Sequence, residues 1–397
     1  MCDVAVIGAG VIGLAIAREV LIRAPGLRVV VFDKEPKAAA HASGRNSGVL
    51  HAGFYYSPDS LKAQLTRRGN DMLRAFCLEH EIPVNECGKV VVTQRESELD
   101  ALDELARRAE ANDVDVDVIS TKELAVREPL ARTVDRALWS PRTAVASPGR
   151  VGDALAADVR TRGGLTVFDA AVTWDGPGRL TAAGRRWSAS HVVNAAGLHA
   201  DRLAHSQGFG ERYRVLPFKG LYLYGNWPVG RLTRLVYPVP DPRNPFLGVH
   251  LTLTVDGRVK LGPTAVPALW REQYGWRNPV AADALEISRT MPLFLRSPHH
   301  DVASLLRTEL PKYSRRVLAK EASRLVPAVS PRDFRERGRP GIRAQLFDLE
   351  ERRLVMDFVV EGDARSTHVL NAVSPAWTSS LAFAELVVDR IPEVARI

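Results

Sequence analysis

The chain has 397 residues, of which 46% are hydrophobic and 25% charged. This length allows two domains with substantial cores, and the composition is that of an ordinary globular protein, which excludes a disordered or fibrous chain. The formal net charge of +8 is compatible with nucleic acid, an anionic membrane surface or acidic substrates as partners. No apolar run approaches the ~20 residues that cross a bilayer, and the first residues form a strand rather than a signal peptide, so we expect a cytoplasmic protein.

The cysteines and the basic residues narrow these classes further. Cys2, Cys77 and Cys87 are odd in number and lack C-x-x-C spacing, which argues against a disulfide framework and a zinc site, so we expect no metal. Arginines are scattered, and their densest run, residues 332–343, is interrupted by acidic residues, Gly and Pro. We therefore do not expect nucleic-acid binding.

The first 35 residues carry a nucleotide-binding pattern. An apolar run at 4–7 leads directly into Gly8, Gly10 and Gly13 and then an apolar helix. The first glycine allows a tight turn, the second a close approach of the backbone to a pyrophosphate, and the third the packing of helix on strand. A second strand, residues 28–32, ends in Asp33, twenty residues beyond Gly13, which can accept hydrogen bonds from a ribose 2′-hydroxyl. The pattern predicts a dinucleotide with an ADP half and leaves FAD and NAD open.

The patterning of the first half of the chain then predicts alternating elements. We expect helices from 57–59 onward, over 96–112 and over 150–162, and strands over 84–93, 114–119, 165–172 and 187–193. The last of these strands ends in a turn of small residues, 194–197, which returns the chain to the nucleotide-binding domain.

The pattern changes between residues 213 and 261 to an apolar alternation broken by prolines. This predicts an antiparallel sheet with long loops, which forms a second domain inserted between segments of the first. We expect helices within 281–325, strands near 342–345, 354–360 and 367–371, and a final helix from about 376.

Residues 43–56 form a glycine- and serine-rich loop that is too polar for a strand and too small for a core. It resembles the flavin loop of the L-2-hydroxyglutarate dehydrogenase/oxidase family, within the D-amino-acid oxidase-like superfamily of FAD-dependent oxidoreductases. The resemblance continues through 57–63, 217–220, 237–241, 245–252, 341–345 and 371–375, in the order that the family has.

The resemblance implies the fold and its division. It implies an α/β protein with a Rossmann-type FAD-binding domain and an inserted antiparallel-sheet substrate domain, as in D-amino-acid oxidase and glycine oxidase. We predict the FAD-binding domain at 1–85, 146–212 and 335–397, and the substrate-binding domain at 86–145 and 213–334.

The resemblance also implies an activity: FAD-dependent oxidation of L-2-hydroxyglutarate to 2-oxoglutarate by hydride transfer to flavin N5, with electrons passed to quinone or oxygen. A dicarboxylate substrate suits the basic charge, and so does a peripheral contact with the inner face of the cell membrane. Two alternatives stay open: an oxidase of another 2-hydroxy acid or of an amino acid or amine, and a basic flavoprotein that binds RNA or a membrane partner without this chemistry. The oligomeric state is open.

The resemblance and the requirements of the reaction select the catalytic residues. His51 is the predicted base, Arg343 the predicted carboxylate-binding residue, and His250 a further catalytic candidate. Tyr237, Lys219, Arg343 and His250 are the predicted substrate-binding residues. Each has a structural alternative, such as a loop histidine or a sheet histidine.

The predicted cofactor-binding residues begin with the glycine motif and end at the last helix, whose N-terminus can face the flavin pyrimidine or can carry an ordinary cap. They are Gly8, Gly10, Gly13, Asp33, Lys34, Ser43, Arg45, Asn46, Ser47, Gly48, Val172, Ala196, Gly197, Ser374, Pro375 and Thr378. Four positions depart from the family pattern, namely Lys219 for an arginine, Leu221 for an acid, Thr264 for an asparagine and Trp377 for a small residue.

Overall fold

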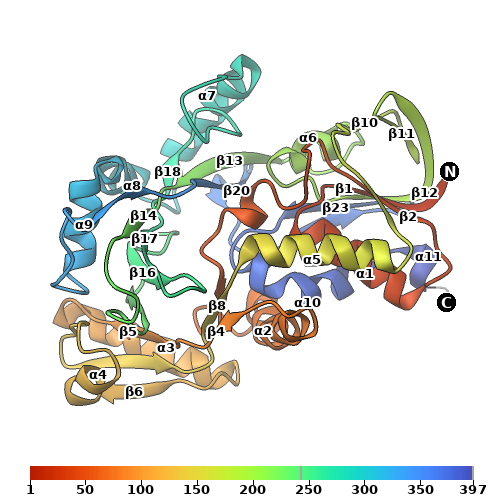
Figure 1. Cartoon of the computed structure of the whole chain (residues 1–397). Helices are drawn as coiled ribbons and strands as arrows, with labels where there is room; N and C mark the ends of the chain where they lie inside the picture. Colours follow the sequence, from red (N-terminus) through yellow and green to blue (C-terminus); the bar gives the residue numbers. More distant parts are fainter. Residues whose placement is uncertain (242–243, 396–397) are drawn as a thin grey trace.

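The computed structural model describes residues 1–241 and 244–395, whose strands form four sheets. In Figure 1 the first sheet lies on the right, with helices beneath it, and the third lies on the left. Two long strands of the second sheet cross between them, and both chain termini lie at the right-hand edge.

The first sheet is a parallel core with antiparallel additions. Its parallel strands, in spatial order, are β9 (Leu165–Val167), β2 (Val29–Phe32), β1 (Cys2–Ile7), β12 (Arg185–Asn194) and β23 (Ser366–Asn371). The antiparallel strands are β22 (Val359–Gly362) beside β23, and β11 (Arg179–Ala182) and β10 (Thr173–Trp174) beside the first half of β12. All four residues of β2 are buried, because both faces of this sheet are covered.

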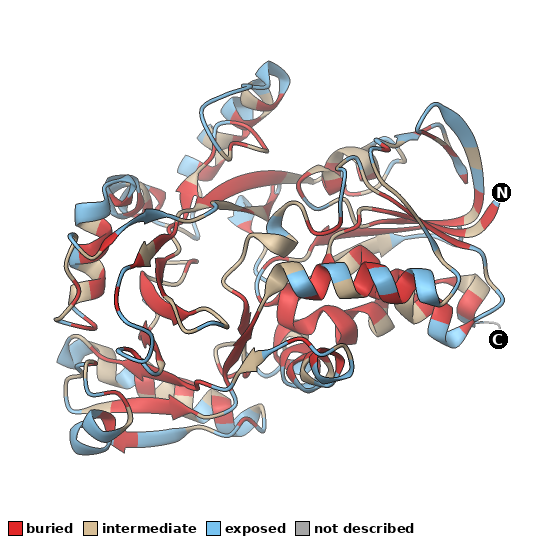
Figure 2. Cartoon of the chain, in the orientation of Figure 1, coloured by how far each residue is buried: buried red, intermediate tan, exposed pale blue. Residues whose placement is uncertain are grey.

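Helices cover one face of the first sheet. They are α1 (Val11–Arg23), α5 (Pro148–Thr161), α10 (Ala376–Val388) and, against α10, α2 (Leu61–Glu79). The alternation of β1 divides its side chains: Val4 and Val6 join the core under these helices, whereas Ala5 and Ile7 join the core on the other face. Figure 2 shows α5 with a buried face toward the sheet and an exposed face turned outward, whereas α1 is exposed only at its last two residues. The short helices α6 (Ala200–His205) and α11 (Pro392–Ala395) complete this half of the chain.

The third sheet joins strands from two distant parts of the sequence. In spatial order they are β19 (Phe334–Arg337), β14 (Leu223–Gly225), β17 (Val259–Gly262), β16 (His250–Leu253), β15 (Leu235–Pro238), β5 (Lys89–Val92), β7 (Arg136–Ser140) and β6 (Asp117–Ser120). The pair β5 and β15 is parallel, and the other neighbours are antiparallel. The helices of this half are α3 (Leu99–Ala111), α4 (Thr121–Arg127) and α9 (Arg315–Ser323), with the 3₁₀ turn η2 (Glu96–Glu98).

The second sheet connects these two halves. Strands β13 (Tyr213–Gly220) and β20 (Gly341–Asp348) pair antiparallel along their whole length, so that Phe218 faces Arg343. Strands β18 (Val266–Pro267) and β21 (Arg353–Leu354) flank them, and α7 (Ala281–Leu295), α8 (Val302–Glu309) and the 3₁₀ turn η4 (Leu310–Tyr313) lie beside them. The smallest sheet consists of β3 (Val49–Leu50), β8 (Ala144–Ala146) and β4 (Val84–Asn85).

Three predicted strands differ from the structure. The strand predicted over 354–360 is wrong, because β21 and β22 are separate strands in different sheets. The strand predicted over 84–93 is divided into β4 and β5 at Gly88, which has a φ of 66°. The strand predicted over 165–172 ends at Val167, and the chain turns at Asp169, where φ is 52°.

The predicted domain division stays a prediction. At its boundary near residue 335, β19 pairs with β14 in the third sheet. Of the helices in residues 1–241 and 244–395, none has both the length and the apolar character needed to span a bilayer.

Candidate functional site

A cavity of about 880 Å³ lies between the ends of β1, β2 and β12, the segment 39–51, the β13–β20 pair and the N-terminus of α10. It gathers most of the residues predicted from the sequence. Its wall includes Gly8, Gly10, Asp33, Lys34, Ser43, Arg45, Asn46, Ser47, His51, Val172, Ala196, Gly197, Tyr237, His250, Arg343, Ser374, Pro375 and Thr378. Three predicted residues, Gly13, Gly48 and Lys219, do not line it.

The glycines of the first turn make one end of the cavity. Gly8 has a φ of 111°, and a Cβ at this position would lie 2.4 Å from the carbonyl oxygen of Ala195. A Cβ on Gly13 would lie 2.0 Å from the carbonyl oxygen of Gly8, so Gly13 is needed where the helix packs on the turn rather than in the wall. The turn leaves the N-terminus of α1 open to the cavity, which is the geometry that binds a pyrophosphate.

Asp33 lies in the wall at the end of β2. Its Oδ2 accepts a hydrogen bond from the amide of Ala9 at 2.7 Å, and its Oδ1 accepts one from the amide of Glu35 at 2.8 Å. These bonds fix the carboxylate beside the glycine turn, and each oxygen keeps a further lone pair. The position suits an acceptor for a ribose hydroxyl.

Lys34 belongs to a polar cluster at the rim of the cavity. Its Nζ lies 2.5 Å from Oε1 of Glu35 and 2.8 Å from Oε1 of Glu272, and His41 and His199 bind the same carboxylates at 2.9 and 2.8 Å. Glu35, His41 and Glu272 together have the spacing of metal ligands, but the ammonium of Lys34 already supplies the cation between the two carboxylates. The pKa of Glu272 is lowered to about 2, because the hydrogen bonds from His199 and Lys34 outweigh the effect of burial.

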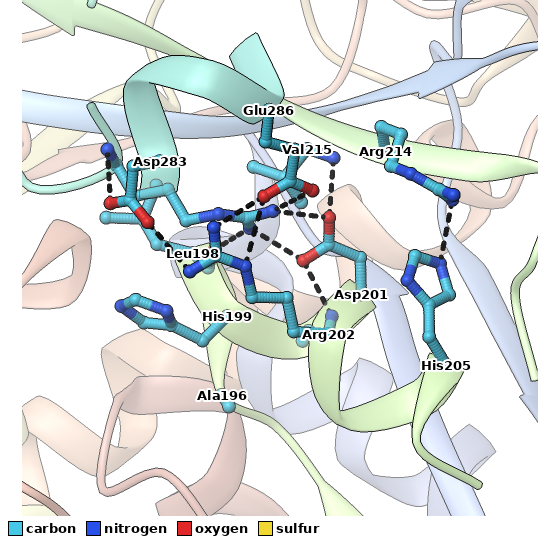
Figure 3. Close-up of polar contacts among 12 residues, drawn as sticks. Ala196, Leu198, His199, Asp201, Arg202, His205, Arg214, Val215, Asp283 and Glu286 are labelled. Atoms are coloured by element: carbon cyan, nitrogen blue, oxygen red, sulfur yellow. Dashed lines mark hydrogen bonds and ion pairs between the residues drawn. The ribbon is translucent and has the colours of Figure 1, made fainter. Parts of the chain in front are cut away.

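A buried ion-pair network holds the segment that carries Glu272 (Figure 3). Arg271 is fully buried, and its guanidinium donates to both carboxylate oxygens of Asp201, at 2.6 and 2.8 Å, and to Glu286 at 2.8 Å. Arg202 extends the network to Asp283 and Glu286 at 2.7 and 2.5 Å. Figure 3 shows Asp201 and Arg202 of α6 facing Asp283 and Glu286 of α7. Arg271, the residue before Glu272, also donates to the carbonyl oxygen of Leu198, which fixes the wall around 196–199 relative to residue 272.

The glycine- and serine-rich loop is tied to both ends of the site. Oγ of Ser43 accepts a hydrogen bond from the amide of Val11 at 2.9 Å, so the loop caps the first turn of α1. Farther along, Nζ of Lys260 donates to the carbonyl oxygen of Ser47 at 3.1 Å. Lys260 is buried, which lowers its pKa to about 8.

The N-terminus of α10 faces the same loop. Oγ1 of Thr378 accepts from the amide of His51 and donates to the carbonyl oxygen of Val49, both at 3.1 Å. Nδ2 of Asn70 on α2 donates to the carbonyl oxygen of His51 at 2.9 Å. These bonds hold the backbone on both sides of the His51 imidazole at the start of α10, where helix N–H groups are free to bind a ligand.

Two imidazoles, His51 and His250, line the cavity. Burial, with smaller contributions from the charge of Lys89 and from His250, lowers the pKa of His51 to about 3. Burial also lowers the pKa of His250 to about 3. Nδ1 of His250 bonds the carbonyl oxygen of Gly248 at 2.8 Å, which makes Nδ1 the protonated nitrogen and leaves a lone pair on Nε2. Both rings are therefore neutral hydrogen-bond acceptors at neutral pH.

Arg343 provides a cation close to these rings. It lies on β20, opposite Phe218, with its Cζ 5.1 Å from the ring centre of Phe246. Burial lowers its pKa, with Tyr222 and Glu309 acting in the opposite direction. Arg343 has no ion-pair partner among residues 1–241 and 244–395, so its planar fork is free to bind a carboxylate.

Lys219 occupies a different position from the one predicted. It pairs with Ile342 in the β13–β20 ladder, next to the Phe218–Arg343 pair, and side chains of neighbouring strand residues point to opposite faces. Its side chain is thus on the opposite face from Arg343, and burial lowers its pKa.

One of the four departures from the family pattern, Thr264, has a structural explanation. Oγ1 of Thr264 donates to the carbonyl oxygen of Lys219 at 2.9 Å and accepts from the amide of Leu221 at 3.0 Å, so Thr264 holds the end of β13. Trp377 is buried in the wall, and its Nε1 has no hydrogen-bond partner within the described part of the chain.

Sequence reasoning did not identify Tyr222, Phe218 and Glu272, which also line the cavity. Phe218 lies within the block 217–220, and Tyr222 lies two residues beyond it. The alternation of side chains along this strand could have indicated that both face the cavity. Glu272 has no signal in the sequence, because its partners Lys34 and His199 lie far from it along the chain.

The parallel sheet and the glycine turn at the start of α1 are the architecture of a dinucleotide-binding protein. Residues 3–390 match the family model described as FAD dependent oxidoreductase. The chain belongs to this family, and the cofactor of the family is FAD. The fold class predicted from the sequence is confirmed.

Relatives and solved structures agree with this assignment. The chain is 36% identical to the mitochondrial L-2-hydroxyglutarate dehydrogenase of Nematostella vectensis, covering 98% of this chain and 90% of the relative. It is 33% identical to the L-2-hydroxyglutarate dehydrogenase of Escherichia coli strain K12, covering 98% and 93%. The resemblance noted in the sequence is thus confirmed. The fold resembles L-alpha-glycerophosphate oxidase of Mycoplasma pneumoniae (TM-score 0.79, 21% identity, coverage 98% and 94%) and glycine oxidase of Geobacillus kaustophilus (TM-score 0.74, 21% identity, coverage 100% and 95%).

Proposed function

We propose that this protein oxidises L-2-hydroxyglutarate to 2-oxoglutarate with FAD as its cofactor. The observation that carries the proposal is that two neutral imidazoles, His51 and His250, and the guanidinium of Arg343, which has no ion-pair partner among the described residues, line one cavity. The relatives named L-2-hydroxyglutarate dehydrogenase support the same substrate.

The residues of the cavity fit FAD. Gly8 and Gly10 leave room for a pyrophosphate at the start of α1, and Asp33 presents a fixed carboxylate to the adenosine ribose. Ser43, Asn46 and Ser47 line the middle of the cavity, and Ser374, Pro375 and Thr378 line the end at α10. Bound FAD supplies the flavin N5 atom that accepts a hydride.

His51 removes the hydroxyl proton of the substrate in this proposal. An alcohol proton is far too weakly acidic to leave unaided as the hydride departs, so a neutral acceptor must be within hydrogen-bond reach. His51 stands on the loop that Thr378 and Asn70 fix to the start of α10. His250 faces the same cavity, and its Nε2 lone pair is the alternative acceptor of this one proton.

Arg343 binds the substrate carboxylate next to the reacting carbon. A guanidinium matches a carboxylate with two parallel hydrogen bonds and so fixes its orientation. Tyr237, which stacks on His250 with ring centres 3.8 Å apart, forms an adjoining part of the wall. The position of Lys219 on the other face of β13 removes it from this set.

The test is a panel of 2-hydroxy and 2-amino acids, each as both enantiomers, with a redox dye as acceptor and the flavin spectrum recorded. We expect L-2-hydroxyglutarate to have the highest kcat/KM and to yield 2-oxoglutarate. Faster turnover of an amino acid with release of ammonia would replace the proposal by an amine oxidase. Absence of turnover combined with salt-dependent retention of RNA would favour the binding-protein alternative.

The electron acceptor in this proposal is a quinone or oxygen, and a quinone requires contact with a membrane. A group of exposed apolar side chains in residues 269–313 supports that contact: Leu269, Trp276, Val280, Leu285, Leu295, Leu310 and Tyr313. Exposed arginines at 277, 289 and 296 lie among them, which suits an anionic lipid surface. In Figure 1, α7 of this segment stands out at the top of the molecule.

Vesicle sedimentation tests the membrane contact. We expect the protein to sediment with phosphatidylglycerol vesicles and a Trp276→Ser/Leu285→Ser variant to remain mostly in the supernatant. If the parent protein does not sediment with these vesicles, the membrane contact is contradicted and oxygen is left as the proposed acceptor.

A further inference from the structure

A lysine lies behind the imidazole wall, outside the residues used so far. Lys89, the first residue of β5, is 0% exposed, and its Nζ has no hydrogen-bond partner within the described part of the chain. Taking a charge out of water is costly unless an opposite charge is near. Among the described residues no carboxylate counters the effect of burial, which lowers the pKa of Lys89 to about 7.

Aromatic rings surround the ammonium. Nζ of Lys89 lies 4.4 Å from the ring centres of Phe54 and Tyr55 and 5.0 Å from that of Tyr237. Cation–π attraction of this kind stabilises the charged form only partly. The hydroxyl of Tyr55 is also buried without a hydrogen-bond partner in the described chain, so it does not solvate the ammonium.

Lys89 lies behind a residue of the cavity wall, Tyr237. In the parallel β5–β15 pair, Lys89 is level with Leu235, and Tyr237 lies two residues farther on the same face. Tyr237 lines the cavity and stacks on His250. Burial is the main cause of the lowered pKa of both His51 and His250, and the charge of Lys89 contributes to a smaller extent in the same direction.

We infer that Lys89 is a specificity-determining residue, whose buried ammonium attracts the second carboxylate of a dicarboxylate substrate through the wall formed by Tyr237. This inference rests on the proposed substrate. Arg343 binds the carboxylate beside the reacting carbon, and Lys89 in its protonated form, which predominates below pH 7, supplies the positive charge for the other end. Nζ lies 5.0 Å from the centre of the Tyr237 ring, so an anion on the other side of that ring is on the order of 10 Å away. In surroundings of effective dielectric about 20, a unit charge at about this distance changes the affinity for an anion by roughly tenfold.

A structural role makes a different prediction. If Lys89 only filled space among the rings, its removal would affect mono- and dicarboxylates equally. Because methionine has a similar length and no charge, Lys89→Met removes a buried, unpaired charge and should leave thermal stability unchanged or raised. Lys122 on α4 is exposed to solvent. Lys122→Met therefore removes the same net charge from the surface instead of the interior and is the matched control.

The experiment is equilibrium dialysis of the FAD-loaded protein with glutarate and with pentanoate, which differ only in the second carboxylate. We expect Lys89→Met to weaken glutarate binding about tenfold and pentanoate binding less than threefold, with Lys122→Met like the parent. Equal changes for both ligands, or no change for glutarate, would overturn the inference. So would a parent that binds glutarate no more tightly than pentanoate.

Thermal unfolding of the same three proteins gives a second readout. Loss of stability in Lys89→Met together with equal weakening of both ligands would assign the lysine to the core. Binding needs no turnover, so a parent that prefers glutarate but does not oxidise L-2-hydroxyglutarate would contradict the proposed reaction while supporting the role of Lys89.

Discussion

Replacement of His51 tests the proposed base. General base catalysis by a positioned imidazole contributes about 10²–10⁴ in rate, and we expect two variants of His51 to fall at opposite ends of this range. His51→Ala leaves a space in the cavity wall that a water molecule can enter and act as a weak base, so we expect a loss near 10². His51→Phe fills the space without an acceptor, so we expect a loss nearer 10⁴.

The assay is anaerobic stopped-flow mixing with L-2-hydroxyglutarate while the absorbance of the flavin is recorded. Both variants should retain FAD, because the backbone of residue 51, not its ring, bonds Thr378 and Asn70. His299→Ala, which removes an exposed imidazole, should behave like the parent. Near-parental reduction by His51→Phe, with a large loss in His250→Ala, would refute the assignment and make His250 the base.

The pH profile of the parent provides a further check on the same reasoning. The pKa of His51 is lowered to about 3, so the free enzyme keeps the neutral base far below the ordinary imidazole range. We expect kcat/KM to stay level between pH 5 and 8 with respect to this group. A bound dianion raises the pKa of a neighbouring imidazole, so the acid limb of kcat should lie at higher pH than that of kcat/KM. A kcat/KM limb near 6.5 would show that His51 is more solvated than the structure indicates.

Four further predictions follow from named contacts. Arg343→Lys should lower kcat/KM at least about tenfold with FAD retained, since lysine keeps the charge but loses the two-pronged fork; equal kinetics would move the carboxylate site. Asp33→Ala should weaken FAD retention by about 1–3 kcal/mol, measured by dialysis, and unchanged occupancy would place Asp33 outside the nucleotide site. Arg271→Met should lower the free energy of unfolding by about 3–5 kcal/mol in denaturant titration, because Asp201 is left buried and uncompensated; a smaller loss would mean that the network relaxes. The pKa of His51 and of His250 is about 3 in the folded protein and about 6.5 when unfolded, so between these values the unfolded chain binds more protons than the folded one. The free energy of unfolding should therefore be full above pH 6.5 and should fall as the pH drops toward 3, as measured by denaturant titration at each pH.

The sequence predicted those parts of the site whose chemistry is local. The turn at Gly8, the helix that follows it and the acid at Asp33 lie within one strand–helix–strand unit, so spacing along the chain determines their spacing in space. Arg343 was recognisable because the short block around it resembles the family motif.

Other residues could not be predicted because their partners lie far away in sequence. Lys89 stands beside three valines in β5, where alternation alone does not indicate whether its ammonium is exposed or buried. Its rings come from residues 54, 55 and 237, which only the folded sheet brings together. Lys219 shows the reverse case: the motif indicated a role in binding, whereas its register on β13 places the side chain away from Arg343.

The central claim is most directly tested by anaerobic titration of the purified, FAD-loaded protein with the two enantiomers of 2-hydroxyglutarate, followed by analysis of the product. We predict that the L enantiomer reduces the flavin with one equivalent of 2-oxoglutarate formed per FAD, and that the D enantiomer leaves the flavin oxidised. Reduction by both enantiomers alike, or by neither while an L-amino acid reduces the flavin, would contradict the account.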